Sequence, residues 1–268
     1  MNKAELVFKA IDVLGHVPQN AKSFDGITCI KDIAYGEADL QKGDLYFKND
    51  ANKLGDKKPI VLYIHGGGFT GGCGHEKHFD GPVWPTKGII GVTLNYRLGP
   101  MGFVCLPELK QEAGYTGNYG LYDQMTAISW VKDNIAAFGG DSENITIMGQ
   151  SAGAMSVQLL CRSPLTKGLF QKAVMSSGCG MMDMMSGNME KNGAFWQQVM
   201  ERCGCKTLEE FRNVSPEALF EAWQQAKKEI KGGGMASFPV QDGCFVVKGA
   251  QPKDLVYMAG ATSHDMTP

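Results

Sequence analysis

The stretch ITIMGQSAGAMSV, residues 145–157, places a serine between two glycines in the spacing Gly149-x-Ser151-x-Gly153. An apolar, β-branched run precedes the serine and a helix-forming run follows it, so the pattern predicts a sharp turn from a strand into a helix. Such a turn exposes the serine hydroxyl at the end of the strand and requires small neighbours, because larger side chains would clash with the strained backbone. We interpret Ser151 as a nucleophile, with a purely structural turn as the alternative.

A second group of glycines, in YIHGGGFTGG, directly follows an apolar run at residues 59–64. Glycines leave backbone N–H groups open to a ligand, which is what an oxyanion hole requires. We expect Gly67 and Gly68 to donate there, together with the N–H of Ala152 at the N-terminus of the helix after Ser151. The alternative is a phosphate-binding loop, but the glycine spacing matches neither common phosphate-binding motif.

Strand and helix patterns alternate along the chain and would bring these residues to strand ends. The alternation predicts an α/β fold in which a mostly parallel central sheet carries helices on both faces, in a single domain spanning residues 1–268. Strands are predicted at residues 59–64, 88–96, 144–149 and 172–178, with one more strand running into a loop at residues 254–265, and helices at residues 120–138, 152–161, 193–202 and 216–231.

Composition narrows the class of protein. The chain has 268 residues, 43% of them hydrophobic, and a net charge of −2 without charge blocks, which favours a folded protein and gives no basic surface for nucleic acid. No apolar run approaches the length of a membrane span, and acidic residues interrupt the apolar N-terminal stretch, so we expect no export signal. Eight cysteines without a CxxC pair predict reduced, mostly buried thiols in a cytoplasmic protein and no metal site.

With these motifs the sequence resembles the carboxylesterase type B branch of the α/β-hydrolases, which includes cholinesterases and carboxylesterases. The resemblance implies that Ser151 is the nucleophile, that Gly67, Gly68 and Ala152 form the oxyanion hole, and that Asp265 holds the position of the triad acid. It covers residues 59–268 and rests on HGGGF, NYRLGPMGF, GNYGLYDQMTAISWVKDNIAAFGGDSENITIMGQSAGA and KGLFQKAVMSSG, and more loosely on FPVQDG and AGATSHD.

The sequence departs from the family pattern at several positions. Asp265 replaces the usual glutamate, Gln150 replaces the glutamate that commonly precedes the serine, and Ala154 replaces a glycine. Gln150 removes a negative charge beside the nucleophile while it keeps hydrogen-bonding capacity. The first 55 residues do not show the family's long N-terminal strand region.

The triad histidine is the main gap in the pattern. Triads on this fold run serine, then acid, then histidine along the chain, and His264 is the only histidine after Ser151. His264 directly precedes Asp265, where neighbouring side chains point in different directions, so we regard it as a weaker candidate for the base than a histidine from a missing region. We expect the C-terminal strand and histidine loop to be absent, which would leave a sheet edge open to self-association or to complementation by another chain.

Several other residues have both a structural and a functional interpretation. His65 is expected to organise the glycine loop, and His75 and His78 to lie in a surface loop with metal binding as the weaker alternative. The MMDMM segment, with Met181 and Met182, could form an adaptable acyl pocket or fill the core. We also expect a partly buried ion pair between Arg97 and Asp123.

The favoured function is hydrolysis of a small carboxylic ester through an acyl-enzyme formed on Ser151, with no cofactor. Two alternatives remain. One is a catalytically silent protein of the same fold that binds partners or small esters, and the other is a lipase of the hormone-sensitive type. The second alternative shares HGGG but would not require NYRLGPMGF or FGGD.

Overall fold

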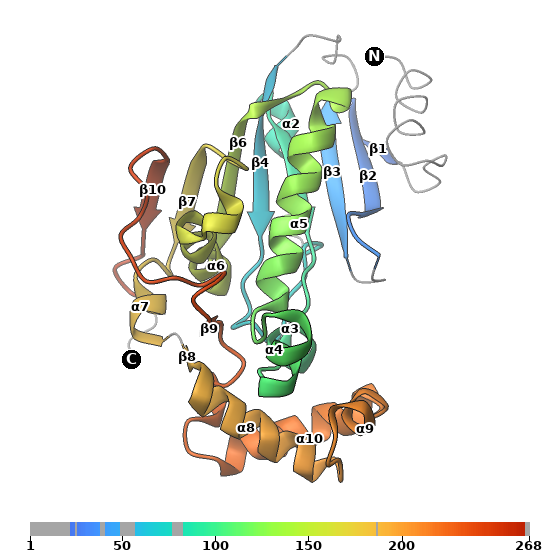
Figure 1. The fold of residues 1–268 in the computed structure, drawn as a ribbon. Coiled ribbons are helices and arrows are strands. Elements are labelled where there is room, and N and C mark those ends of the chain that lie inside the picture. The colour runs from blue at the N-terminus through green and yellow to red at the C-terminus, as the bar shows by residue number, and fades with distance from the viewer. Residues whose placement is uncertain are drawn as a thin grey trace.

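An eight-stranded sheet forms the centre of the part of the chain that the computed structural model describes, namely residues 22–24, 26–37, 41–48, 57–76, 83–185 and 187–265. The strand order is β1-β2-β3-β5-β4-β6-β7-β10, and the last five strands in this order run parallel (Figure 1). The strands are β1 (Lys22–Phe24), β2 (Ile27–Ala34), β3 (Lys42–Lys48), β4 (Lys58–Ile64), β5 (Ile90–Leu94), β6 (Gly140–Gln150), β7 (Lys172–Ser176) and β10 (Val256–Gly260).

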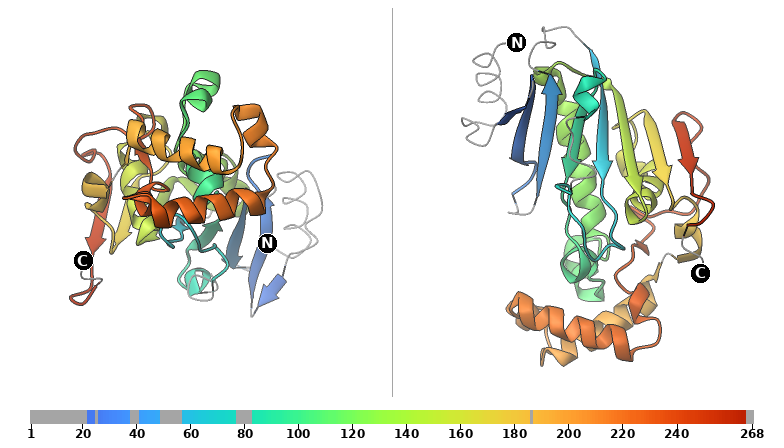
Figure 2. Two further views of the ribbon diagram at one scale, coloured as in Figure 1. Left: turned by 90° about the horizontal axis from the view of Figure 1, so that it is seen from below. Right: turned by 180° about the vertical axis from the view of Figure 1, so that it is seen from behind.

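Helices lie on both faces of this sheet, as the sequence predicts for an α/β fold. The long α5 (Tyr119–Asn134) and α6 (Ala152–Arg162) cover one face, and the short α2 (Val83–Thr86) lies on the other (Figures 1 and 2). All five residues of β5 are buried, which explains why its sequence is almost uniformly apolar. The expected helix at residues 120–138 divides into α5 and a 3-10 turn, η1 (Ile135–Phe138), which ends at Gly139 with a φ of 81°.

The first 55 residues contain three strands in antiparallel pairs, which the sequence pattern did not predict. β2 pairs with β1 on one side and with β3 on the other, and β3 continues the sheet onto β5. The pairing of β2 with β3 shifts register between Ile30 and Ile33, and Asp32 within this bulge has a φ of 57°. The bulge and the charged side chains around it interrupt the alternation that would have indicated a strand. Residues 1–21, where the export signal was considered, lie outside the described residues.

A second group of helices lies beyond the carboxyl ends of the parallel strands, at the bottom of Figure 1. Their apolar faces form a hydrophobic cluster of their own, in which Trp196 and Trp223 are the largest buried side chains. The indole N–H groups of these tryptophans donate to the carbonyl of Ala236 and the hydroxyl of Ser237. The principal helices here are α8 (Met189–Arg202), α9 (Leu208–Arg212) and α10 (Pro216–Glu229), and α3 (Gly99–Phe103) and α4 (Pro107–Ala113) lie between them and the sheet.

Shorter elements connect these two parts. The single-domain interpretation of residues 1–268 stays a prediction, since the structure contains two hydrophobic clusters. The connecting elements are α7 (Met181–Met185), β8 (Gly187–Asn188), η3 (Gly233–Met235) and β9 (Val240–Gln241), while η2 (Pro164–Thr166) lies between α6 and β7.

The cysteines and helices bear on two further expectations. None of the eight cysteines forms a disulfide, but only Cys29, Cys105, Cys161 and Cys205 are buried, so the expectation of mostly buried thiols was only half right. Among the described helices, none combines the length and the apolar character that crossing a membrane would require.

The sheet order predicts a clear contrast between a central and an edge position. Leu62 is fully buried in β4. Leu62→Ala should lower the free energy of unfolding of the protein by about 2–5 kcal/mol, because the truncation removes buried surface and leaves a cavity. Met258 in β10 is 69% exposed, and Met258→Ala should change the stability by less than about 0.5 kcal/mol. Urea titration of both variants measures the difference, and equal losses would contradict the sheet order.

Candidate active site

Ser151 occupies the tight turn that the sequence predicts between β6 and α6. Its φ of 54° and ψ of −124° fall outside the regions that side-chain-bearing residues usually adopt. Small residues make the turn possible, because a Cβ on Gly153 would overlap the carbonyl oxygen of Ile64, and a Cβ on Gly149 would overlap the backbone of Gly153. The nucleophile candidate is thus held by contacts between backbones, in a strained conformation typical of functional sites.

The glycine loop after β4 lies directly against this turn. A Cβ on Gly66 would lie 2.8 Å from the carbonyl oxygen of Gln150 and 3.3 Å from Cβ of Ser151. Gly67 and Gly68 have φ angles of 101° and 62°, which favour glycine at both positions. The loop therefore approaches Ser151 as closely as backbone atoms allow.

Three backbone N–H groups of the turn and the glycine loop lack a hydrogen-bond partner among the described residues, those of Gly67, Gly68 and Ala152. The carbonyl of Gly67, by contrast, accepts bonds from Thr70 N and Gly71 N, both at 3.1 Å, which close the loop on itself. Free amides beside a helix N-terminus can stabilise a negative charge. The residues predicted to form an oxyanion hole thus have the free donors that such a hole requires.

The end of β7 supplies a third backbone segment, which the sequence analysis did not single out. Ser151 N donates to the carbonyl of Ser176 at 3.0 Å. A Cβ on Gly178 would lie 2.5 Å from the carbonyl oxygen of Ser151, so the chain after β7 also needs a glycine beside the turn. The signal was present in the sequence as the glycine of KAVMSSG, but the spacing alone does not show which backbone it contacts.

His65 is buried below the glycine loop. Its Nδ1 lies 2.8 Å from the carbonyl oxygen of Gly66, so Nδ1 carries the proton, and Nε2 is buried with no partner among the described residues. Its ring stacks on Tyr96, with centroids 4.4 Å apart, and the Tyr96 hydroxyl donates to the carbonyl of His65. Burial lowers the pKa of His65 from its ordinary value, although the Gly66 carbonyl and Glu76 act in the opposite direction.

Arg97 and Asp123 form the expected ion pair and brace the same edge of the sheet. The guanidinium donates from Nε and from one terminal nitrogen, both at 2.8 Å, and the backbone N–H of Arg97 adds a third bond at 2.9 Å. Asp123 is almost fully buried, and its bonds raise the pKa of Arg97. A doubly bonded pair of this kind fixes α5 against the segment after β5.

Asp265 and His264 follow β10, whose carboxyl end lies at the same edge of the sheet as that of β6. Both residues are exposed. Nδ1 of His264 lies 3.0 Å from the hydroxyl of Ser263, and Asp265 N donates to the carbonyl of Thr262. Among the described residues, no histidine forms a hydrogen bond with Ser151.

The remaining predicted pocket residues divide between the site and the core. Gln150 is exposed beside the glycine loop, and its side-chain oxygen would lie 3.4 Å from a Cβ on Gly66. Met182 is buried in the main hydrophobic cluster and Met181 packs against that cluster, which favours the core-filling interpretation for both. α7, which carries them, is tied to α6 by the ion pair of Arg162 with Asp183.

Two cavities lie away from Ser151. One, of about 270 Å³, is lined by Arg162 and Lys167 at the C-terminal end of α6, while Ser151 lies at the opposite end of that helix. The other, of about 710 Å³, lies between α8 and η3. Neither is lined by the turn or the glycine loop.

One described group, Asp32, Asp44 and His75, has ligand atoms within 4.8 Å of one another and could hold a metal by proximity. However, the buried Asp44 carboxylate already accepts a bond from the N–H of Asp32, and Nδ1 of His75 lies 2.8 Å from its Oδ2. These contacts describe a network of hydrogen bonds and ion pairs within the protein. His78, the second histidine of the expected surface loop, lies outside the described residues.

The parallel sheet, the serine at a strand-to-helix turn and the glycine loop against it define an α/β-hydrolase. The model of the Carboxylesterase family matches residues 44–266, and the chain belongs to this family. The sequence is 36% identical to human bile salt-activated lipase over 260 residues, and 40% identical to the para-nitrobenzyl esterase of Bacillus subtilis over 198 residues.

These matches cover most of this chain but a smaller part of the relatives. The chain spans 34% of the human lipase and 40% of the Bacillus esterase, and 89% and 73% of this chain is aligned in the two comparisons. A solved structure described as a PNB esterase superposes with a TM-score of 0.79 and 28% identity, covering 91% of this chain and 61% of the other. A carboxylesterase of Geobacillus stearothermophilus gives a TM-score of 0.74 and 30% identity, with coverage of 83% and 55%.

The environment of His65 predicts a pH dependence of stability. Because burial lowers the folded-state pKa of His65 below its ordinary value of 6.5, the unfolded chain binds a proton first as the pH falls. The stability contributed by neutral His65 should be present above the unfolded pKa and decrease as the pH falls through it. His65→Asn keeps a donor for the Gly66 carbonyl but does not titrate.

Urea titrations at about pH 7.5 and about pH 5.5 test this prediction. The unfolding free energy of the wild type, relative to that of His65→Asn, should fall between the two conditions. A difference that stays constant would show that His65 has the same pKa in both states.

Proposed function

We propose that this protein hydrolyses small carboxylic esters with Ser151 as the nucleophile. The observation that carries the proposal is the position of Ser151, in a strained turn against the glycine loop, where the N–H groups of Gly67, Gly68 and Ala152 have no partner among the described residues. Membership of the Carboxylesterase family and the esterases among its relatives support the same reaction class.

The reaction would follow the acyl-enzyme route. Oγ of Ser151 attacks the ester carbonyl carbon while a base takes the hydroxyl proton, and the carbonyl oxygen becomes an oxyanion. The N–H groups of Gly67, Gly68 and Ala152 stabilise that charge, and collapse of the intermediate expels the alcohol, which receives the proton. Water then attacks the acyl-enzyme in the same way, releasing the acid and restoring Ser151.

Asp265 is the proposed triad acid, because it follows β10 at the edge of the sheet where Ser151 lies. The base is not His65, whose buried Nε2 has no donor or acceptor beside it among the described residues, or His75, whose Nδ1 faces Asp44. Gln150 is proposed to lie beside the bound ester without taking part in proton transfer.

A second candidate function is binding of a partner or a small ester without turnover. It is favoured by one observation, that no histidine of the described region forms a hydrogen bond with Ser151. An unactivated serine is a weak nucleophile. Covalent labelling separates the two functions, because it requires a reactive serine.

The first prediction for this proposal concerns labelling. A fluorophosphonate should add once to the wild type, as measured by intact mass, and Ser151→Ala should abolish the adduct while leaving the unfolding free energy within about 0.5 kcal/mol. Ser177→Ala is the matched control, because Ser177 also has a positive φ, of 52°, beside the same edge. An adduct that persists in Ser151→Ala would show that another residue is the nucleophile, and no adduct on the wild type would favour binding without turnover.

The second prediction concerns His264. Turnover of p-nitrophenyl acetate by the wild type should be slow, and His264→Ala should change it by less than about twofold, because no bond joins His264 to Ser151. Strong turnover that collapses in His264→Ala would instead make His264 the general base. Strong turnover in both proteins would point to a different histidine.

A further inference from the structure

The glycine loop is attached to the sheet at two places. Its first end is the carboxyl end of β4, where His65 and Gly66 leave the sheet. The loop then returns past His65, since a Cβ on Gly72 would lie 2.7 Å from both Nδ1 of His65 and the carbonyl oxygen of Gly66. At Gly74 and His75 it reaches the end of β5 and the next strand, β3.

Gly74 contacts the backbone at the end of β5. Its N–H donates to the side-chain oxygen of Asn95 at 2.9 Å, and a Cβ on Gly74 would lie 2.7 Å from the carbonyl oxygen of Leu94. Asn95 is itself fixed, because its N–H donates to the carbonyl of Lys42 and its carbonyl accepts from the hydroxyl of Tyr35. The second attachment is therefore made to a rigid part of the sheet.

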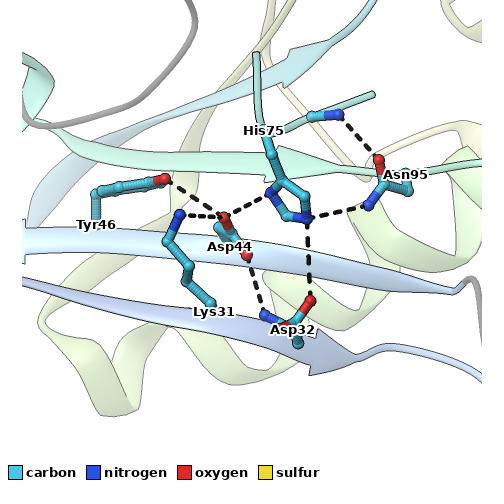
Figure 3. Close-up of polar contacts among 7 residues, drawn as sticks. Lys31, Asp32, Asp44, Tyr46, His75 and Asn95 are labelled. Carbon is cyan, nitrogen blue, oxygen red and sulfur yellow. Dashed lines mark hydrogen bonds and ion pairs between the residues drawn. The ribbon is translucent and has the colours of Figure 1, made fainter. Parts of the chain in front are cut away.

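His75 completes this attachment through a carboxylate buried in β3 (Figure 3). Its Nδ1 lies 2.8 Å from Oδ2 of Asp44, whose side chain is 0% exposed. On the other side of the ring, Nε2 lies 3.5 Å from the Asn95 amide and 3.9 Å from the exposed carboxylate of Asp32. The imidazole thus joins the loop to β2, β3 and the end of β5.

The burial of Asp44 makes the groups that contact its carboxylate important. A buried carboxylate is costly unless donors surround it. The sheet supplies Asp32 N at 3.0 Å, the Tyr46 hydroxyl at 3.3 Å and the Lys31 ammonium at 3.8 Å. The shortest contact of the carboxylate, however, comes from His75, so withdrawing the loop would remove its nearest donor.

We propose that His75 is a positioning residue, which anchors the glycine loop on Asp44 and thereby holds the Gly67 and Gly68 N–H groups against Ser151. The inference rests on the proposed function for its effect on catalysis, while the anchor itself is a statement about the loop. His75 does not touch the reacting atoms. It acts through the six residues between Gly68 and His75, of which Thr70 and Gly71 donate to the carbonyl of Gly67.

The position of the anchor predicts which kinetic constant changes. The oxyanion exists only in the transition state, so donors that are misplaced reduce kcat more than they raise KM. For p-nitrophenyl acetate, His75→Ala should lower kcat by roughly 10- to 100-fold and change KM by less than about threefold.

Two amide variants separate the two sides of the imidazole. In His75→Asn the amide nitrogen takes the place of Nδ1 and can still donate to Asp44, whereas His75→Gln places its amide near the position of Nε2. The asparagine variant should recover most of the lost kcat, and the glutamine variant should not. Asp32→Asn is the matched control: asparagine tolerates the positive φ of Asp32, and an exposed ion pair contributes little, so kcat should change by less than about twofold.

Hydrogen–deuterium exchange tests the anchor without reference to activity. Amides of residues 65–76 should exchange faster in His75→Ala than in the wild type and return toward wild-type rates in His75→Asn. Unchanged exchange in His75→Ala would overturn the anchor, and faster exchange with unchanged kcat would overturn its positioning role. If the wild type gives neither product nor fluorophosphonate adduct, the proposed function fails, and exchange alone decides the anchor.

A control for metal binding completes the experiment, because the ligand atoms of Asp32, Asp44 and His75 lie close enough together to bind a cation. Exchange in the wild type should be the same with EDTA and with Zn²⁺. If EDTA speeds amide exchange at residues 65–76, or Zn²⁺ slows it, a metal ion and not the direct contact with Asp44 holds the loop. The proposal is then wrong.

Discussion

Close approach of three backbone segments at one edge of the sheet is the constraint on which the site depends. Gly153 lies against the carbonyl of Ile64, Gly66 lies against the turn at Ser151, and Gly178 lies against the carbonyl of Ser151. A side chain at any of these glycines would meet backbone atoms, which cannot move away as a flexible side chain can. The unusual backbone angles of Ser151 are kept by this packing, which compensates for their conformational cost.

The surrounding structure holds those segments in register. Parallel strands β4, β6 and β7 end together, so the loops that follow them meet at one edge. The Arg97–Asp123 pair braces the same edge from α5. The ring of Phe69 in the glycine loop lies 5.2 Å, between centroids, from the ring of Phe103 in α3 and from that of Phe238, between η3 and β9. The loop is therefore held by aromatic contacts as well as by the sheet.

Two histidines of one loop have opposite environments, and this difference assigns them different roles. His65 is buried with one nitrogen unpartnered among the described residues, so burial keeps it neutral. His75 lies 2.8 Å from the buried carboxylate of Asp44 and 3.9 Å from the exposed carboxylate of Asp32, so it contacts the sheet through polar groups. Neither environment suits a residue that must exchange protons with Ser151.

The sequence alone determined the alternation of strands and helices, the turn at Ser151 and the glycine loop, because periodicity and glycine spacing are local properties of the chain. It missed the strands before residue 49, where a bulge at Asp32 and the buried charge of Asp44 disturb the pattern. Only the tertiary structure decided that Met182 is in the core and that His75 meets Asp44. Those contacts join segments far apart in the chain, and local spacing carries no record of which distant groups pack together.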